Sequence, residues 1–545
     1  MLIADLHIHS RFSRATSREG DPEHLDLWAR RKGIHLVGTG DFTHPGWRQE
    51  LQEKLEPAEE GLYTLRPSLQ LEPWEGGTPP RFVVTGEISS IYKKDGKTRK
   101  VHSLILLPGL EAAEALSRRL EAVGNLRSDG RPILGLDCRD LLELTLETCP
   151  EALFVPAHIW TPHFSLFGAF SGFDSIEECF GDLTPQIRAL ETGLSSDPPM
   201  NWRISALDGL TLLSNSDAHS PAKLGREANL LEIPYSYPAL VQAVCGGREA
   251  GWRGTVEFFP EEGKYHWDGC RDCGPGLSPE QAEALGGICP VCGKKLTVGV
   301  EHRTLQLADR MAGFQPPDAA PFERLAPLPE VIAASAGLGP ASARADRVYR
   351  LLLRQLGPEF YILRQAPLAD VGRVAGQWVE EGLRRLRAGQ ARWTPGYDGV
   401  YGKLELLTPE ERQAYGGQVS WFGGVSAPAA RKAPALPKTP VSSPKKESAP
   451  RQDPAGLNPA QQAAVCSQSP ALAVVAGPGT GKTHTLTARI LRLLETGSKP
   501  GQITAVTFTT HAADQLRQRL EQAAGKSAAR AMRVGTFHSL CLELA

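Results

Sequence analysis

Short apolar runs that end in a histidine or an acidic residue recur through the first 255 residues and constrain the fold more than any other feature. The first, ADLHIHS, places His7 and His9 two residues apart, so both side chains lie on one face of a strand. Other runs carry a similar residue at or near an end: Asp41, Glu87, His102, His158, Asp217 and His219. In an α/β barrel the carboxyl ends of the strands meet at one face. We therefore expect an α/β fold that brings these side chains together.

The chemistry of this residue set predicts a metal centre. Imidazoles combined with carboxylates suit Zn, Mn or Fe better than Ca or a simple Mg site, and Mg stays among the candidates. Paired metals lower the pKa of a bound water and neutralise charge on a phosphate. We therefore predict a phosphoesterase whose catalytic residues include Glu87, Asp217 and His219, with Asp217 or His219 moving the proton. Glu191, which ends the strand IRALE, is predicted to be structural.

The bulk composition bounds the class of protein. A chain of 545 residues is too long for one core, so several domains are expected. The formal net charge of -2 excludes a uniformly basic surface, so nucleic-acid binding requires local patches. No apolar run has the length of a membrane span or a signal peptide. Most of the 10 cysteines are scattered singly, which is typical of a reducing compartment and predicts a cytoplasmic protein.

Four cysteines form a pattern of their own. The pairs CRDC and CPVC contain Cys270, Cys273, Cys289 and Cys292. Two CxxC pairs at this separation are typical of a closed structural zinc site. We predict one structural Zn that organises a small ribbon and performs no chemistry.

A basic stretch, SSIYKKDGKTRKVHS, connects the runs that carry Glu87 and His102. Its Asp-Gly pair predicts a hairpin turn. The flanks of the turn carry the candidate DNA-binding residues Lys93, Lys94, Lys97, Arg99 and Lys100. Lysines also protect exposed hairpin edges without binding anything. A basic tip beside a metal centre nevertheless favours a polyanion such as DNA over a small phosphate monoester.

An aromatic stretch, IWTPHFSLFGAFSGF, follows His158. It contains Trp160, Phe164, Phe167, Phe170 and Phe173. Two interpretations stay open for these rings. They form the core of a lid, or they stack on an unpaired base or wedge against it.

Changes in composition divide the chain into five segments. Residues 1–255 are the predicted metal-dependent barrel, 256–310 the zinc ribbon, and 311–422 a small helical domain. Residues 423–456 are rich in proline, lysine and arginine and predict a disordered linker. Residues 457–545 begin a further α/β domain.

That last segment contains the motif VVAGPGTGKTHTL between an apolar strand and a helical stretch, which is the context of a phosphate-binding loop. The predicted ligand is ATP with Mg, bound by Gly477, Gly479, Thr480, Gly481, Lys482 and Thr483. No acidic stretch follows that would hold Mg and a water. We therefore expect no ATPase or helicase activity from this chain.

The order HxH, Asp, Gly-Glu, His, Ala-His and Ser-Asp-Ala-His resembles the PHP family of phosphoesterases over residues 1 to about 235. The resemblance implies a distorted seven-stranded β/α barrel that binds two or three divalent metals. It implies a first metal held by His7, His9, Glu87 and Asp217. It implies a second metal held by His102 and His158 and bridged by Glu87. A third would be served by His219 and Asp41.

Two departures from the PHP pattern bear on the third metal. The family often has an acidic residue shortly after the first pair of histidines, where this chain reads SRATS at 13–17. The usual Asp-His of the second motif reads Asp41-Phe42, and His44 is displaced by two residues.

A narrower resemblance, over residues 1 to about 410, is to the endonuclease Q family. It is carried by DLHIHSRFSRATS, GTGDFTHPGW, VVTGEISSIYKKDGKTRKVHSLILLP, SNSDAHSPAKLGREAN, the cysteine pairs, LPEVIAASAGLG and GYDGVYGKLEL. It implies a DNA repair nuclease that cuts 5′ of uracil, hypoxanthine, xanthine or an abasic site. Its partners would be damaged duplex or single-stranded DNA, and other repair factors.

The segment from 457 onward resembles superfamily 1 DNA helicases of the UvrD and PcrA type. LNPAQQAAV places Gln461 where these helicases recognise adenine, and TFTTHAADQLRQRL and GTFHSLCLELA resemble their next motifs.

Three alternatives to a repair nuclease stay open for the whole chain. They are a PHP-type small-molecule phosphatase, an ATP-driven helicase with an accessory PHP domain, and a non-catalytic DNA-binding scaffold.

Overall fold

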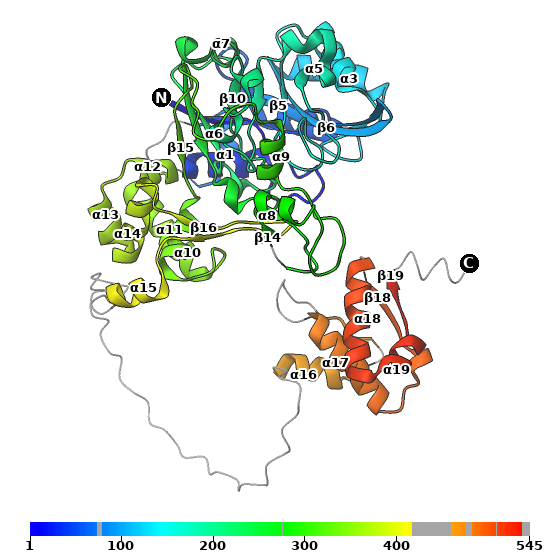
Figure 1. The fold of residues 1–545 in the computed structure, drawn as a ribbon. Coiled ribbons are helices and arrows are strands. Elements are labelled where there is room, and N and C mark those ends of the chain that lie inside the picture. Colours follow the sequence, from blue (N-terminus) through cyan, green and yellow to red (C-terminus); the bar gives the residue numbers. More distant parts are fainter. Residues whose placement is uncertain are drawn as a thin grey trace. The chain divides into compact units, whose positions relative to one another are not determined.

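A computed structural model describes residues 1–72, 79–274, 276–416, 459–469, 471–474, 482–507 and 510–536. The chain divides into two compact units, Met1–Ala427 and Pro428–Ala545. Figure 1 colours the first from blue to yellow and the second from orange to red. The predicted linker at 423–456 and the predicted phosphate-binding loop at 477–481 lie outside the described residues.

The first unit is built on a mixed sheet of eleven described strands. Its parallel centre consists of β1 (Leu2–Asp5), β2 (Leu36–Gly38) and β5 (Arg81–Lys94). Antiparallel neighbours extend it: β11 (Ala228–Leu231) and β12 (Trp252–Glu257) beyond β1, and β6 (Lys97–Leu107) and β8 (Leu153–Pro156) beyond β5. The shorter strands are β3 (Leu55–Pro57), β4 (Tyr63–Leu65), β7 (Ile133–Leu134) and β15 (Phe322–Arg324). A separate parallel pair is formed by β9 (Ala189–Glu191) and β10 (Thr211–Leu213).

Both faces of this sheet are buried, which explains why its strands read as nearly continuous apolar runs. Along β6, Leu104 packs in one hydrophobic cluster and its neighbour Ile105 in another. The mixed α/β fold that the sequence predicted is confirmed. The closed seven-stranded barrel stays a prediction, because the described pairing gives an open mixed sheet and a separate two-stranded sheet.

Helices surround the sheet (Figure 1). They are α1 (Pro22–Lys32), α2 (Pro45–Lys54), α3 (Leu110–Glu121), α4 (Cys138–Thr148), α5 (Ile176–Phe180), α6 (Pro198–Asn201) and α7 (Tyr237–Gly246). The bounds of α1 follow from local chemistry. Asp21 caps its amino end by accepting a hydrogen bond from the His24 amide, and Gly33 ends it in a left-handed conformation.

The remainder of the first unit contains the cysteine segment and a helical segment. The cysteine segment has β13 (Asp268–Gly269), β14 (Gly276–Leu277), α8 (Pro279–Ala284) and α9 (Val300–Leu307). The helical segment has α10 (Leu328–Ala336), α11 (Ala343–Leu356), α12 (Glu359–Arg364), α13 (Leu368–Ala375), α14 (Gln377–Arg387) and α15 (Pro409–Gly416).

The predicted helical domain at 311–422 also contains strands that the sequence did not predict. Strand β15 pairs with β12 and so joins the central sheet. Strands β16 (Arg392–Thr394) and β17 (Lys403–Glu405) form a hairpin. These strands are three residues long, which is too short for alternation to identify them.

The second unit alternates helices and strands as expected of an α/β domain. It contains α16 (Pro459–Cys466), α17 (Lys482–Glu495), β18 (Thr504–Thr507), α18 (Thr510–Ala524), α19 (Lys526–Ala531) and β19 (Arg533–Thr536). Strands β18 and β19 are parallel. Among the described residues, every helix is too short or too polar to span a lipid bilayer.

Candidate metal centre

Residues near the ends of several strands of the first unit meet at one place. His7 and His9 follow β1, His158 follows β8, and Asp217 follows β10, while Glu87 lies within β5. The loops after β1 and β10 are joined directly, because the His9 amide donates to the Ala218 carbonyl at 2.9 Å. The strands therefore supply potential ligands from both ends of the first domain's sequence.

The first group of potential ligands contains His7, His9, Glu87 and Asp217, whose ligand atoms all lie within 4.8 Å of one another. His9 Nε2 lies 3.1 Å from Asp217 Oδ1 and 3.3 Å from Glu87 Oε2. Within the described part of the chain, Nε2 of His7, Nε2 of His9 and Oδ1 of Asp217 are buried without a hydrogen-bond partner. Buried polar atoms are normally paired, so this donor set fits a divalent metal.

The second group contains Glu87, His102 and His158. Glu87 Oε1 lies 2.6 Å from His102 Nδ1 and 3.0 Å from His158 Nε2. The other oxygen of Glu87, Oε2, faces His9 and the first group. Glu87 therefore belongs to both groups, one carboxylate oxygen to each.

Burial and charge act against each other in this centre. Burial opposes the ionised form of Glu87, but the charges of His102 and Arg131 hold its pKa well below the usual value. For Asp217, burial also opposes ionisation, while the close approach of His9 and the charge of His7 lower its pKa. For His102, burial dominates and lowers the pKa to about 4, which leaves its ring nitrogens available as ligands.

Other carboxylates orient the ligand rings. Glu191 accepts a hydrogen bond from His7 Nδ1 at 2.9 Å and from the His158 amide at 2.9 Å. Asp41 Oδ1 lies 3.0 Å from His9 Nδ1. Metal-binding histidines usually have such a partner on the second ring nitrogen, which fixes the ring and directs the other nitrogen at the metal. Glu191, predicted to be structural, thus supports His7 and His158.

The third metal position, served by Asp41 and His219, stays a prediction. Asp41 Oδ2 accepts hydrogen bonds from Ser10 and Ser13, so both of its oxygens are engaged. His219 directs Nδ1 at the carbonyl of Asp217. In the described residues, neither Asp41 nor His219 belongs to a group of three potential ligands. Nε2 of the displaced His44 lies 3.2 Å from the Arg127 carbonyl oxygen.

The backbone at the centre adopts conformations that are uncommon for residues other than glycine. The φ angles of Asp41, His158 and Asp217 are 51°, 32° and 46°. Such conformations cost of order 1–3 kcal/mol each and persist where the surrounding structure enforces them, often at functional sites. Gly130 also packs closely: a Cβ atom there would lie 2.3 Å from Asp41 Oδ2.

Two further residues at the centre were not predicted from the sequence. Arg131 Nη1 lies 3.1 Å from Glu87 Oε2. The carboxylate of Asp5 accepts hydrogen bonds from the amides of Ser216 and Gly225 and holds the loop before Asp217. Asp5 stands within the first histidine motif, and that position is the signal that could have identified it. Arg131 lies in a polar loop with no motif of its own.

Comparison with solved structures identifies the family. The lesion-specific endonuclease PfuEndoQ from Pyrococcus furiosus is 31% identical, with a TM-score of 0.65, over 74% of this chain and 95% of its own. An endonuclease Q in complex with a 27-mer duplex, with an abasic lesion at the active site, is 31% identical, with a TM-score of 0.66. The match covers 76% of this chain and 98% of that structure's chain. The chain belongs to the endonuclease Q family. YqxK of Bacillus subtilis is 29% identical over 74% of this chain and 99% of its own.

The carboxyl-terminal segment of this chain matches a second family. Residues 457–544 fit the UvrD/REP helicase N-terminal domain. The ATP-dependent DNA helicase UvrD1 of Mycobacterium bovis is 47% identical over 90 residues, which are 16% of this chain and 12% of the helicase. The predicted joining of a nuclease to a helicase-like segment is thus confirmed. Of the predicted ATP-binding residues, Gln461 lies in α16, and Lys482 and Thr483 begin α17.

The predicted basic hairpin forms at the expected turn, but its charges are not equally accessible. Strands β5 and β6 pair up to Lys94 and Lys97, with Asp95 and Gly96 at the turn. Lys93 and Lys97 are exposed, whereas Arg99 is buried, donates to the Gly172 carbonyl and lies 4.1 Å from the centroid of the Phe173 ring.

Arg99 therefore holds the aromatic loop, and a DNA contact by this residue stays a prediction. Lys94 is also engaged, since its Nζ donates to the Cys179 carbonyl at 3.1 Å. Lys100 Nζ lies 5.2 Å from the centroid of Phe164. The accessible charge of the hairpin is thus mainly that of Lys93 and Lys97.

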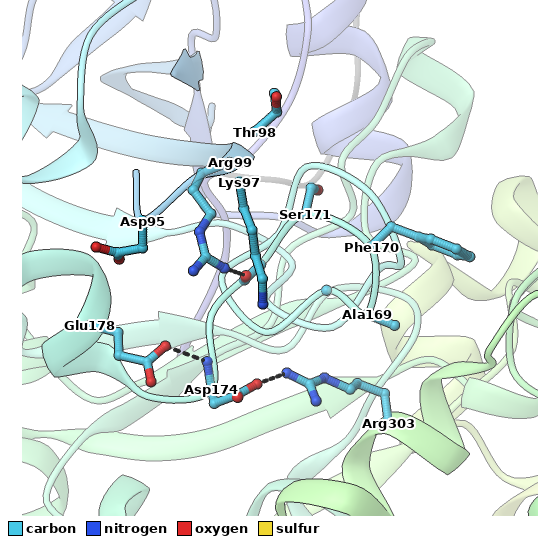
Figure 2. A pocket seen from close by; sticks show the side chains of 12 residues that line it. Asp95, Lys97, Thr98, Arg99, Ala169, Phe170, Ser171, Asp174, Glu178 and Arg303 are labelled. Carbon is cyan, nitrogen blue, oxygen red and sulfur yellow. Dashed lines mark hydrogen bonds and ion pairs between the residues drawn. The ribbon is translucent and has the colours of Figure 1, made fainter. Parts of the chain in front are cut away.

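A cavity of about 680 Å³ lies between the hairpin tip and the aromatic loop (Figure 2). Lys97 and Arg99 project into it from the hairpin, and Arg303 from α9 lies across from them. Its lining also includes the acidic residues Asp95, Asp174 and Glu178. The carboxylate of Asp174 is paired with Arg303.

The aromatic stretch divides between the two interpretations. Trp160, Phe167 and Phe173 are buried in the main core, as expected for the core of a lid. Phe170 is 52% exposed and stacks on His163, with ring centroids 4.8 Å apart. Among the five aromatic residues named in this stretch, Phe170 is the most exposed.

A second cavity of about 230 Å³ has a lining that includes Asp197, Met200, Arg203, Glu261, His266 and Arg324. The segment 193–203 starts against His158, since a Cβ at Gly193 would lie 2.4 Å from the Cβ of His158. His266 lines the cavity together with Glu261 and Arg203. In the part of the chain described, each of these three side chains has one buried polar atom without a hydrogen-bond partner.

The four predicted zinc ligands also meet. Cys270, Cys273, Cys289 and Cys292 form one group of potential ligands. The sulfurs of Cys270 and Cys292 are 3.8 Å apart. The cysteine segment is tied to the β16–β17 hairpin, because the Tyr397 hydroxyl donates to the Gly274 carbonyl.

Proposed function

We propose that this chain is a metal-dependent endonuclease of base-damage repair, which cuts 5′ of deaminated bases (uracil, hypoxanthine, xanthine) or abasic sites. As a member of the endonuclease Q family, the chain is a hydrolase of DNA phosphoester bonds. The position of Glu87 carries the proposal, since its two carboxylate oxygens face two separate groups of buried ligands.

Two divalent metals (Zn, Mn, Mg or Fe), bound at these groups, would supply a water of lowered pKa and neutralise charge on the phosphate. Glu87 would join the two groups, and Glu191 would keep Nε2 of His7 directed at the first. His219 is partly exposed, and its ring packs on that of His9, with the two ring centroids 4.6 Å apart. We assign proton transfer to Asp217 or His219. Asp41 is assigned to support of His9.

The damaged base would enter the cavity of about 230 Å³ that His266 lines. It is lined by hydrogen-bonding groups from four segments, including His266, Glu261 and Arg203, with Met200 and Pro260 as apolar walls. A flipped base is commonly recognised by hydrogen bonds to its edge and by stacking. The exposed pair of Phe170 and His163 would stack on the bases that remain.

A substitution in this cavity tests lesion recognition. Replacing His266 by Ala should reduce cutting at uracil and hypoxanthine by more than cutting at an abasic site, because an abasic site presents no base edge. Equal losses on all three substrates would contradict a base-binding role. His24→Ala, in α1 and paired with Asp21, provides the control.

We assign DNA contact at the hairpin to Lys93 and Lys97, and loop support to Arg99. Replacing both lysines by Ala should reduce the log–log slope of affinity against salt by about one unit for each phosphate that the variant no longer binds. Arg99→Ala should instead loosen the aromatic loop. If the slope of DNA affinity against salt is the same for the double variant and the wild type, these lysines only protect the edge of the hairpin.

The decisive experiment is a cutting assay. The full chain, supplied with Mn or Mg, is incubated with end-labelled duplexes that contain one uracil, hypoxanthine, xanthine or abasic site, and the cut is mapped. We expect one nick on the 5′ side of each lesion and none in an undamaged duplex. Hydrolysis of small phosphate monoesters without nicking would favour the phosphatase alternative.

We propose five domains with boundaries at 1–255, 256–310, 311–422, 423–456 and 457–545. The first would be a PHP-type barrel, the second a zinc ribbon with one structural Zn, and the last a partial P-loop domain able to bind ATP with Mg. The match to helicases covers 12% of UvrD1, so we assign unwinding activity to neither segment.

A further inference from the structure

Arg131 lies at the metal centre and has no role in the ligand groups. Its Nη1 is 3.1 Å from Glu87 Oε2, and its side chain is 26% exposed while that of Glu87 is fully buried. A guanidinium stays protonated in proteins, so Arg131 carries a permanent charge beside the buried carboxylate of Glu87 and is also partly open to solvent.

The backbone holds Arg131 in this place. The Gly130 amide donates to the Phe12 carbonyl at 3.0 Å, and the Ser89 amide donates to the Pro132 carbonyl at 3.0 Å. Ser89 is two residues beyond Glu87 on β5. Arg131 is thus anchored both to the loop that carries the first histidines and to the strand that carries Glu87.

A purely structural ion pair would be built differently. Arg30 is buried and donates to the carboxylate of Asp26 and to two backbone carbonyls. Within the described part of the chain, the guanidinium of Arg131 makes one hydrogen bond, to Glu87. A guanidinium has five N–H donors and no lone pair, so Arg131 keeps donors for another acceptor and cannot itself bind a metal.

The electrostatics indicate what that acceptor is. The carboxylates of Glu87, Asp217, Asp41 and Glu191 would balance the formal charge of two divalent cations. The guanidinium of Arg131 then leaves an excess of positive charge. An anion placed between the metals and the guanidinium would be attracted by both. The planar fork of arginine matches two oxygens of a phosphate. Resting on the proposed endonuclease function, we propose that Arg131 binds the non-bridging oxygens of the scissile phosphate and stabilises the charge that develops on them.

The test compares Arg131→Ala and Arg131→Lys with Arg127→Ala in the full chain loaded with Mn. Arg127 is a neighbouring arginine, 69% exposed and paired with Glu121 on the surface. Three quantities are measured: bound metal by elemental mass spectrometry, affinity for inorganic phosphate by calorimetry, and the single-turnover nicking rate on saturating abasic duplex.

We expect Arg131→Ala to keep its metals, to bind phosphate at least tenfold more weakly and to nick about 10²–10³-fold more slowly, as when one transition-state donor is removed. Arg131→Lys should recover part of the activity, and Arg127→Ala should match the wild type. Unchanged phosphate affinity and nicking would overturn the proposal. A fall in bound metal in proportion to activity would also overturn it, because Arg131 would then only position Glu87. If the wild type binds phosphate at least tenfold more tightly than Arg131→Ala but does not nick DNA, the phosphate contact of Arg131 is supported and the endonuclease function is refuted.

Discussion

The centre around Glu87 and the cluster of four cysteines both gather potential metal ligands, but different surroundings hold them. In the centre, His7, His9 and Glu87 are buried, and other side chains fix the histidine rings. In the cysteine cluster, Cys289 is buried and Cys292 is exposed. The apolar core around these cysteines consists of little more than Ala282, Cys289 and Leu296.

This difference separates two uses of a metal. The centre is enclosed by the main core, so its ligands are in place because of packing and hydrogen bonds, and a metal adds chemistry. The cysteine segment has too few apolar contacts to be stable alone. A metal there would supply the free energy of folding itself. Substitutions in the two places should therefore have different consequences.

The largest effect is expected for Asp217→Ala in the centre. Nicking should fall by about a thousandfold or more, the order seen when one member of a catalytic unit is removed. The unfolding free energy should stay near the wild-type value, because the backbone of the centre is held by other contacts. His7→Ala and Glu87→Ala should lose as much, and their effects should not add. Asp182→Ala, at an exposed carboxylate, serves as the control in nicking assays and thermal unfolding.

Cys270→Ser should act on folding instead of chemistry. Structural zinc contributes on the order of 10 kcal/mol to a small domain, so its removal should unfold the ribbon while the centre keeps its own metals. Hydrogen exchange would locate the opened segment, and elemental analysis would count the metals. Cys245→Ser, outside the cluster, should change neither. Disappearance of metal from both sites in the Cys270 variant would contradict their independence.

Asp41→Asn distinguishes a supporting residue from a ligand. If Asp41 only orients His9, metal affinity should fall about tenfold to a hundredfold, while saturating metal should restore the full number of bound ions. A titration monitored by calorimetry measures both quantities. A permanent deficit of one metal per chain would instead assign Asp41 to the third position that the PHP resemblance implies.

No effect on nicking is expected for Lys482→Ala, because hydrolysis at the centre requires no nucleotide energy. Nicking rates of the wild type and the variant are compared with and without ATP. Strong stimulation by ATP that disappears in the variant would show that the helicase-like segment regulates the nuclease, and that the centre is not self-sufficient.

The sequence was sufficient for those features that depend on local pattern. Alternating and strand-end residues identified His7, His9 and Asp217, since strands of period two present such residues on one face. The Asp95–Gly96 turn and the four cysteines followed from turn chemistry and ligand spacing. These features need only short stretches of sequence, so they can be read without a fold.

Contacts between distant segments decided the rest. Arg131 meets Glu87 because the loop at 130 is hydrogen-bonded to the loop at Phe12, and no motif marks the loop at 130. Asp41 is a partner of His9, and Arg99 supports the aromatic loop, although both looked equivalent to their neighbours in sequence. The sequence by itself determined which chemistry is available. Tertiary structure alone decided which side chains gather, which support them and which are accessible, because burial and pairing depend on neighbours far away along the chain.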